Sequence, residues 1–141
     1  GYSSLSGLKI NASQFLGNQG KGTRVFFNQY AQIPISAKWS GTIGWDLGLE
    51  SGNTWHGGLM YLTWRPASSL RMSGRLEYYS DPRGVIMPAA FEDVTRSFAL
   101  DYTLTKKILL RSEAKHSNKF GSEILFGLIF NATLASKFHT H

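Results

Sequence analysis

Hydrophobic and polar residues alternate along most of this chain with a period of two. The clearest run covers residues 39–50, where one set of alternate positions is apolar and aromatic and the other is mostly polar. Successive side chains of a β-strand point to opposite sides, so this run predicts a strand with one apolar and one polar face. The alternation alone leaves open which face is turned inward.

The same pattern predicts eight strands separated by connections rich in turn-forming residues. The expected strands cover residues 3–12, 23–32, 36–49, 55–65, 69–80, 93–104, 106–116 and 122–134. Longer and shorter connections alternate, with a glycine-rich one at 13–22 and the longest at 81–92. In an up-and-down sheet, alternate connections lie at the same end. We therefore expect tight turns at one end and longer loops at the other, as in membrane barrels.

Strand length and composition allow a membrane protein. A β-strand spans a bilayer with about 9–11 tilted residues, and most predicted strands are at least this long. Hydrophobic residues make up 42% of the chain and its mean hydropathy is −0.19. Membrane barrels share such values with soluble proteins, because the apolar residues of one face and the polar residues of the other average out along each strand. A stretch long enough for a transmembrane helix is lacking, and so is cysteine, which excludes a disulfide scaffold.

The fold class that this pattern favours is an all-β, antiparallel, up-and-down transmembrane β-barrel of about eight strands. We expect one barrel domain at residues 1–134 and a C-terminal tail at 135–141 whose His139-Thr140-His141 is typical of a cloning remnant.

Charges of both signs share the polar face from the fifth strand onward. Arg75-Leu76-Glu77 and Arg111-Ser112-Glu113 repeat an Arg-x-Glu pattern, which suits ion pairing on an interior surface because an unpaired interior charge is costly. On a soluble barrel the same charges would form the solvated outer face. The expected lumen charge network consists of Arg75, Glu77, Asp101, Arg111, Glu113, Lys115 and Asp46.

Aromatic residues cluster near the expected strand ends, which is typical of the two aromatic girdles of a membrane barrel. This predicts lipid-interface positions for Tyr30, Trp39, Trp55, Trp64, Tyr78 and Tyr102.

Catalytic and metal-binding arrangements are not expected. Each carboxylate that could form an acid–base pair has a cationic neighbour on its own face, and the four histidines lack ligand spacing apart from the terminal His-x-His. We predict no enzymatic activity, no cofactor and no metal.

The net charge of +6 does not indicate nucleic-acid binding, because the basic residues are dispersed among acidic ones instead of forming a stripe. Expected partners are the lipid bilayer and lipopolysaccharide, the latter through Lys21, Arg24, Arg83 and Lys119 at the long-loop end. The segment Asp81-Pro82-Arg83-Gly84 itself has turn chemistry, which predicts a structural role for Asp81.

Three segments in order resemble the OmpL-like family of β-barrel porins: residues 55–59 with 75–84, residues 100–104, and residues 109–113. The resemblance covers about residues 43–130 and matches the C-terminal part of longer family members. It implies a β-barrel in the outer membrane of Gram-negative bacteria with a pore function.

Three possibilities stay open at this point. Eight strands that close alone leave an interior filled by side chains, which indicates a structural barrel. A homo-oligomer, or a larger barrel of which this chain is one part, would instead form a pore whose basic lumen favours anions. The third is a soluble lipocalin-like or avidin-like barrel with a hydrophobic pocket lined by Trp39, Trp45, Met60 and Phe126.

Overall fold

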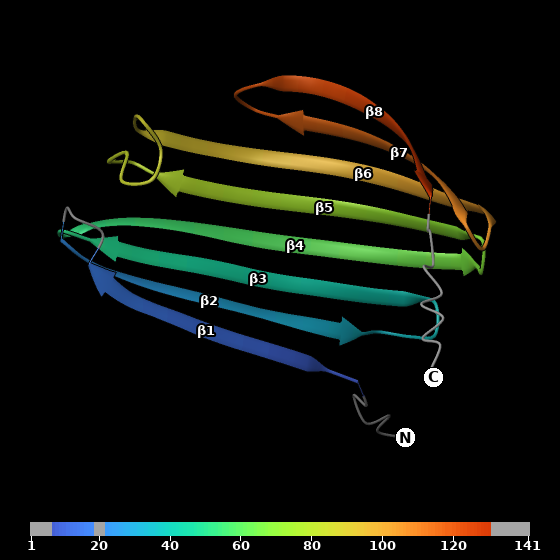
Figure 1. Ribbon diagram of the computed structural model, residues 1–141, viewed down its shortest axis with the longest axis horizontal. Helices are drawn as coiled ribbons and strands as arrows, with labels where there is room; N and C mark the ends of the chain where they lie inside the picture. The colour runs from blue at the N-terminus through green and yellow to red at the C-terminus, as the bar shows by residue number, and fades with distance from the viewer. Residues whose placement is uncertain (1–6, 19–21, 131–141) are drawn as a thin grey trace, which may run out of the picture.

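The computed structural model describes residues 7–18 and 22–130 and contains one antiparallel sheet of eight strands. The strands follow one another in chain order across the sheet, with β1 and β8 at opposite margins (Figure 1). They are β1 (Lys9–Asn18), β2 (Thr23–Pro34), β3 (Trp39–Glu50), β4 (Asn53–Ala67), β5 (Leu70–Asp81), β6 (Phe91–Thr105), β7 (Ile108–Ser117) and β8 (Gly121–Phe130). The up-and-down all-β topology predicted from the alternation is confirmed.

The sheet is open among the described residues, because β1 and β8 each pair with a single neighbour. Its curvature brings β7 and β8 round above β6 in Figure 1. The C-terminal part of the expected last strand and the tail at 135–141 lie outside the described residues.

The first strand was misplaced by the sequence prediction. It begins at Lys9 and continues to Asn18, through residues expected to form a glycine-rich connection. Phe15 pairs with Phe26 and Leu16 with Val25, so the alternation persists although Gly17 and several amides dilute it. Part of the expected connection is therefore strand, and residues 19–21 lie outside the described residues.

Connection lengths also differ from the prediction. Ser51 and Gly52 alone join β3 to β4, and both have positive φ angles of 51° and 79°. Two-residue hairpins favour such turns because their twist matches that of the strands. The single long connection among the described residues is 82–90, between β5 and β6. We call the end of the sheet that carries it the loop end and the opposite end the turn end.

The register places directly paired residues on the same face. One face, which we call the polar face, carries Asp46, Glu77, Asp93, Asp101 and Arg111. Seven of the eight buried polar side chains lie on it, while Trp55 is the one large apolar side chain that is buried among the described residues. The other face, the apolar face, exposes Ile43, Trp45, Met60, Leu62, Leu76, Phe98, Ile124, Phe126 and Leu128. Burial is thus inverted relative to that of a soluble protein.

Candidate functional site on the polar face

The seven residues of the expected lumen network all lie on the polar face, contributed by β3, β5, β6 and β7. They do not form one network. The described contacts divide them among several clusters along the strands, which involve partners that the prediction did not include.

The most buried of these clusters is centred on Asp101, which is only 4% exposed. Arg71, Asp101 and Arg111 lie directly opposite one another on β5, β6 and β7. Arg111 donates from Nε to Oδ1 at 2.6 Å and from Nη2 to Oδ2 at 2.9 Å. Arg71 donates to Oδ2 from Nε at 2.8 Å and also from Nη2. One carboxylate therefore joins three strands through two guanidinium groups.

The repeated Arg-x-Glu pattern has two different outcomes. Arg75 Nη2 lies 2.5 Å from Glu77 Oε2 on the same strand. Arg111 instead turns to Asp101, so it does not repeat this pairing with Glu113 in the described contacts. The Asp101 carboxylate stands directly opposite Arg111 on the neighbouring strand, and a directly opposite pair on an antiparallel ladder brings two side chains close.

Two further members of the predicted network have cross-strand partners. Asn28 on β2 donates from Nδ2 to Asp46 on β3 at 2.5 Å. The Lys115 ammonium on β7 lies 3.3 Å from the Glu123 carboxylate on β8. Both contacts are at the loop half of the sheet.

Arg24, Glu50 and Trp55 form a cluster at the loop end that the sequence analysis did not predict. The Arg24 Nε donates to Glu50 at 2.8 Å, and its guanidinium carbon lies 5.4 Å from the centre of the Trp55 ring. Trp55 also stacks on Phe26 at 6.4 Å between centroids. Arg24 is thereby engaged within the sheet, although it was expected to face lipopolysaccharide.

Two of the six aromatic residues predicted for the lipid interface lie on the polar face. Trp55 is 4% exposed on the polar face, opposite Gly48, and Tyr30 lies on the same face, opposite Gly44. Glycine leaves room there for a large ring on the neighbouring strand. Closeness to a strand end could not reveal this, because the register decides which face a side chain occupies.

The other four aromatic residues lie on the apolar face. Trp39 and Trp64 are directly paired near the turn end and stack at 5.5 Å between centroids. Tyr102 lies near the same end, and Tyr78 lies toward the loop end, where its hydroxyl donates to Glu92 at 3.0 Å. Beyond Tyr78 the apolar face becomes polar, with His56, Ser80 and Glu92. On β6, β7 and β8 the polar residues of this face begin one row earlier, at the level of Leu76, with Arg96, His116 and Ser122.

Asp81 organises the loop at residues 82–90. It is fully buried and accepts backbone N–H groups from Val85 and Ile86 at 2.8 Å and from Met87 at 2.9 Å. Burial alone would raise the pKa of this carboxyl group, but the backbone N–H groups outweigh it and hold the pKa below its usual value. Asp81 lies on the loop side of Tyr78, outside the apolar part of β5. The structural role expected from its turn chemistry agrees with these contacts.

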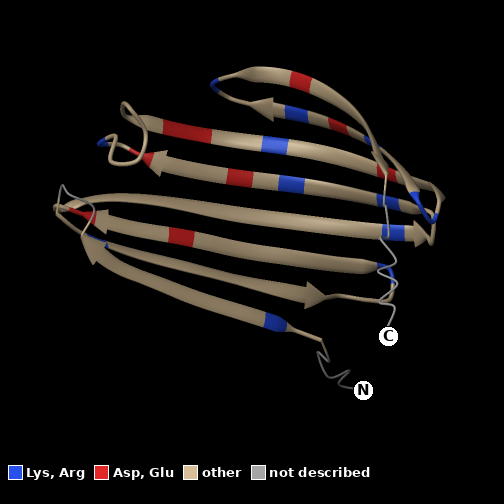
Figure 2. Ribbon diagram, in the orientation of Figure 1, with Lys and Arg blue, Asp and Glu red and all other residues tan. Residues whose placement is uncertain are grey.

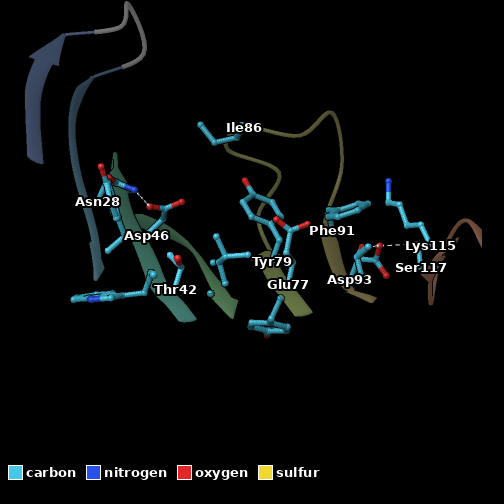
Figure 3. A pocket seen from close by; sticks show the side chains of 18 of the residues that line it. Asn28, Thr42, Asp46, Glu77, Tyr79, Ile86, Phe91, Asp93, Lys115 and Ser117 are labelled. Carbon is cyan, nitrogen blue, oxygen red and sulfur yellow. Dashed lines mark hydrogen bonds between the residues drawn. The ribbon is translucent and has the colours of Figure 1, made fainter. Parts of the chain in front are cut away.

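A hollow of about 1000 Å³ opens on the polar face at the loop half of the sheet. Figure 3 shows Asp46, Glu77, Tyr79 and Lys115 among the side chains around it, with Ile86 of the long loop above them in the view. Three rings line it in a row, with centroids 6.0 Å apart for Tyr79 and Phe91 and 6.1 Å apart for Phe91 and Phe120.

The apolar residues expected to form a soluble binding pocket are placed differently. Trp39, Met60 and Phe126 are exposed by 39%, 58% and 83% and do not line this hollow, whereas Trp45 borders it and is 48% exposed. Charged side chains such as Asp46 and Glu77 share the border of the hollow with aromatic rings. The four residues therefore do not together enclose a hydrophobic pocket of the lipocalin type.

A family model matches residues 1–132, and its description is "Putative beta-barrel porin-2, OmpL-like". The chain belongs to the OmpL-like β-barrel porin family. The match extends to the N-terminal side of residues 43–130, over which the resemblance was recognised. No curated protein and no solved structure matches the chain.

Within the described part of this OmpL-like chain, no helix is long and apolar enough to cross a membrane. The same residues contain no group of three or more His, Cys, Asp or Glu side chains that could hold a metal ion. The chemistry available on the polar face is therefore that of fixed charges, amides, hydroxyl groups and aromatic rings.

Proposed function

We propose that this chain forms the wall of an outer-membrane β-barrel through which ions and small polar solutes diffuse passively. The observation that carries the proposal is the inverted burial: Asp101 and other charged groups are buried on the polar face, while large apolar side chains are exposed on the other. Exposed apolar surface of this extent requires a partner, and a lipid bilayer covers such a surface on every strand.

The distribution along the strands supports the same arrangement. The apolar face is bordered by the stacked Trp39 and Trp64 near the turn end and by Tyr78 toward the loop end. Aromatic side chains favour the two membrane–water interfaces, where one edge of the ring is apolar and the other is wet. The strands have 10–15 residues, which suffices for the about 9–11 residues of a tilted span.

The margins of the sheet favour closure into a barrel. An open sheet edge in a bilayer would leave backbone N–H and C=O groups unsatisfied. β1 and β8 both have ten residues, and on both strands the even-numbered positions lie on the apolar face, such as Ile10 and Leu16 on β1 and Ile124 and Phe126 on β8. Antiparallel pairing through these margins keeps the polar face on one side throughout.

The width of the barrel decides whether it conducts. Eight strands closed on themselves leave an interior filled by side chains, whereas more strands leave a channel. We therefore propose that a second copy of the chain, or further strands, join the margins of β1 and β8 in the conducting form. A membrane-anchored structural barrel is the second candidate, and the Arg71–Asp101–Arg111 cluster favours it because these side chains would occupy a narrow lumen.

Planar-bilayer recording tests the pore. We expect stepwise current from protein whose folding is verified by its altered mobility on unboiled gels. Protein that folds and inserts but passes no current would contradict the pore and leave the structural barrel. Native mass spectrometry in detergent micelles then measures how many chains the conducting species contains.

Lipopolysaccharide is the proposed anionic partner at the loop end. Arg83 lies in the 82–90 loop and Lys119 in the β7–β8 turn, where its ammonium lies 4.5 Å from the centre of the Phe91 ring. Lys21 is outside the described residues. Charge on these side chains would attract the anionic headgroup, so R83Q/K119Q should weaken binding to lipopolysaccharide-containing vesicles, and unchanged binding would contradict this partner.

A further inference from the structure

Two hollows on the polar face differ in the sign of their charge. The hollow at the loop half is bordered by four carboxylates and one ammonium group, those of Asp46, Glu77, Asp93, Glu123 and Lys115. The rings of Tyr79, Phe91 and Phe120 complete its wall without adding charge. Glu77 and Glu123 are ion-paired, with Arg75 at 2.5 Å and with Lys115 at 3.3 Å. Among the described residues, the uncompensated charge that solvent meets in this hollow is therefore that of Asp46 and Asp93, and it is acidic.

The second hollow, of about 250 Å³, lies at the turn end. Its border includes Arg65, Arg71 and Lys106 with a single carboxylate, Asp101. That carboxylate already binds two guanidinium groups, from Arg71 and from Arg111. Within the described chain, Arg65 and Lys106 form no ion pair, so their charges act on the hollow without compensation.

Figure 2 shows the same division along the sheet. Acidic positions on the strands lie mainly toward the end that carries loop 82–90, whereas basic positions are found along the whole sheet and outnumber the acidic ones at the opposite end. Although the whole sequence has an excess of basic residues, the loop half and the turn half of the polar face therefore differ in the sign of their charge. Net charge alone predicts an anion-favouring lumen, and the arrangement of the charges does not support a uniform one.

The two halves are far enough apart to act separately. Asp93 and Asp101 lie on the same strand, β6, eight positions apart, which corresponds to about 26 Å at the rise of an extended strand. The Debye length is about 10 Å at 0.1 M salt. The potential of one half is therefore largely screened at the other, and each half attracts its own counterion.

We propose that the lumen is bipolar and that it rectifies ionic current. The inference rests on the proposed pore. A voltage that is positive at the loop end drives cations in through the acidic half and anions in through the basic half, so that both ions accumulate in the lumen. The opposite voltage draws both ions out and depletes it. Current is larger when the loop end is positive.

The test records current through the inserted protein at equal and opposite voltages, in about 0.1 M and about 1 M potassium chloride. We expect a current ratio of about two to three at low salt, because the charged walls create potentials of several kT. The ratio should approach one at high salt, where the Debye length is about 3 Å. The orientation of the inserted protein is read from trypsin added to one compartment, which cuts at Arg83 in the long loop.

Charge variants separate the two halves. R65Q/K106Q removes the uncompensated basic charges, and D46N/E77Q removes two carboxylates of the acidic hollow; each should bring the low-salt ratio toward one. K38Q/K107Q is the matched control, since it removes two basic charges near the turn end that border neither hollow, and it should keep the wild-type ratio. D46N/E77Q also tests the proposal independently if R65Q/K106Q fails to fold.

The outcomes are distinct. Clear conductance with a ratio near one in 0.1 M salt would overturn the bipolar lumen while leaving the pore intact. Equal reductions of the current ratio in K38Q/K107Q and R65Q/K106Q would also overturn the bipolar lumen, because the ratio would then depend on the total charge and not on the charges that border the hollows. Absence of any current from folded, inserted protein would overturn the pore and the rectification together.

Discussion

The Trp55 ring lies directly over Gly48 on the neighbouring strand. A Cβ atom at position 48 would lie 2.0 Å from two atoms of that ring, so a larger residue cannot enter without displacing the indole. The same ring is held by Phe26 and Arg24. The absence of one side chain therefore positions the most buried aromatic group of the described sheet.

We predict that Gly48→Ala destabilises the protein by about 1–3 kcal/mol, the usual cost of overpacking. Urea unfolding in detergent micelles, followed by tryptophan fluorescence, measures the change. Gly74→Ala is the matched control, because a Cβ there meets no atom within 4 Å and should cost little. Equal effects at the two positions would show that the Trp55 contact is not important for stability.

The two arginines that bind Asp101 should not act independently. Removing one leaves the other paired with the carboxylate, whereas removing both leaves a buried charge without compensation, which costs about 3–5 kcal/mol in comparable cases. We expect R71Q and R111Q each to lower the unfolding free energy by less than half of the amount lost in R71Q/R111Q. A double-mutant cycle on unfolding free energies measures the coupling, and simple additivity would contradict a shared carboxylate.

Asp81 should control access to the long loop. Asp81→Asn removes the charge that accepts three backbone N–H groups, so trypsin should cut after Arg83 several times faster at neutral pH, since charge-assisted hydrogen bonds are about twice as strong as neutral ones. Glu92→Gln, at the same end but exposed, is the control. Equal cleavage rates in the wild type and Asp81→Asn would refute this role.

The same contacts predict an acid effect. Folding lowers the pKa of Asp81, so its contribution to loop stability is complete above the unfolded value of about 3.9 and is lost as the pH falls through the lower folded value. Hydrogen exchange at Val85, Ile86 and Met87, corrected for intrinsic rates, should accelerate in this window. Protection that stays constant down to about pH 2 would argue against the predicted coupling.

A charge on the apolar face should disturb folding according to its depth. Met60→Arg places a charge in the middle of the apolar face and should cost about 2–4 kcal/mol in lipid vesicles, whereas His56→Arg, four positions nearer the loop end on the same strand, should cost about 0–1 kcal/mol. Folding yield on unboiled gels and urea titration measure both. Similar costs for the two variants would contradict a membrane boundary near Tyr78.

The alternation of residue types was sufficient to predict the eight-strand sheet and the face that each predicted charge occupies, since both depend only on the period of two. It was insufficient where register matters. Trp55 and Tyr30 were assigned to the interface from their distance to a turn, but each faces a glycine on a neighbouring strand. Arg71 and Glu50 were left out of the charge network because their partners, Asp101 and Arg24, are distant in sequence.

Local composition misled the prediction in the first hairpin. Glycines and amides around Phe15 and Leu16 are typical of a loop, yet pairing with β2 keeps these residues in a strand. The opposite charges of the two hollows also could not be predicted from the sequence, because they depend on which ends of the strands lie together and not on the total charge.

The central claim is that the apolar face meets lipid and the polar face does not, and tryptophan quenching by brominated lipids tests it most directly. Trp45 lies on the apolar face and is 48% exposed, whereas Trp55 lies on the polar face and is 4% exposed. Variants that keep one of the two, with the other tryptophans replaced by phenylalanine, would be reconstituted in vesicles of brominated phosphatidylcholine. Strong quenching of Trp45 with little quenching of Trp55 is the predicted result. Strong quenching of Trp55, or none of Trp45, would contradict the account.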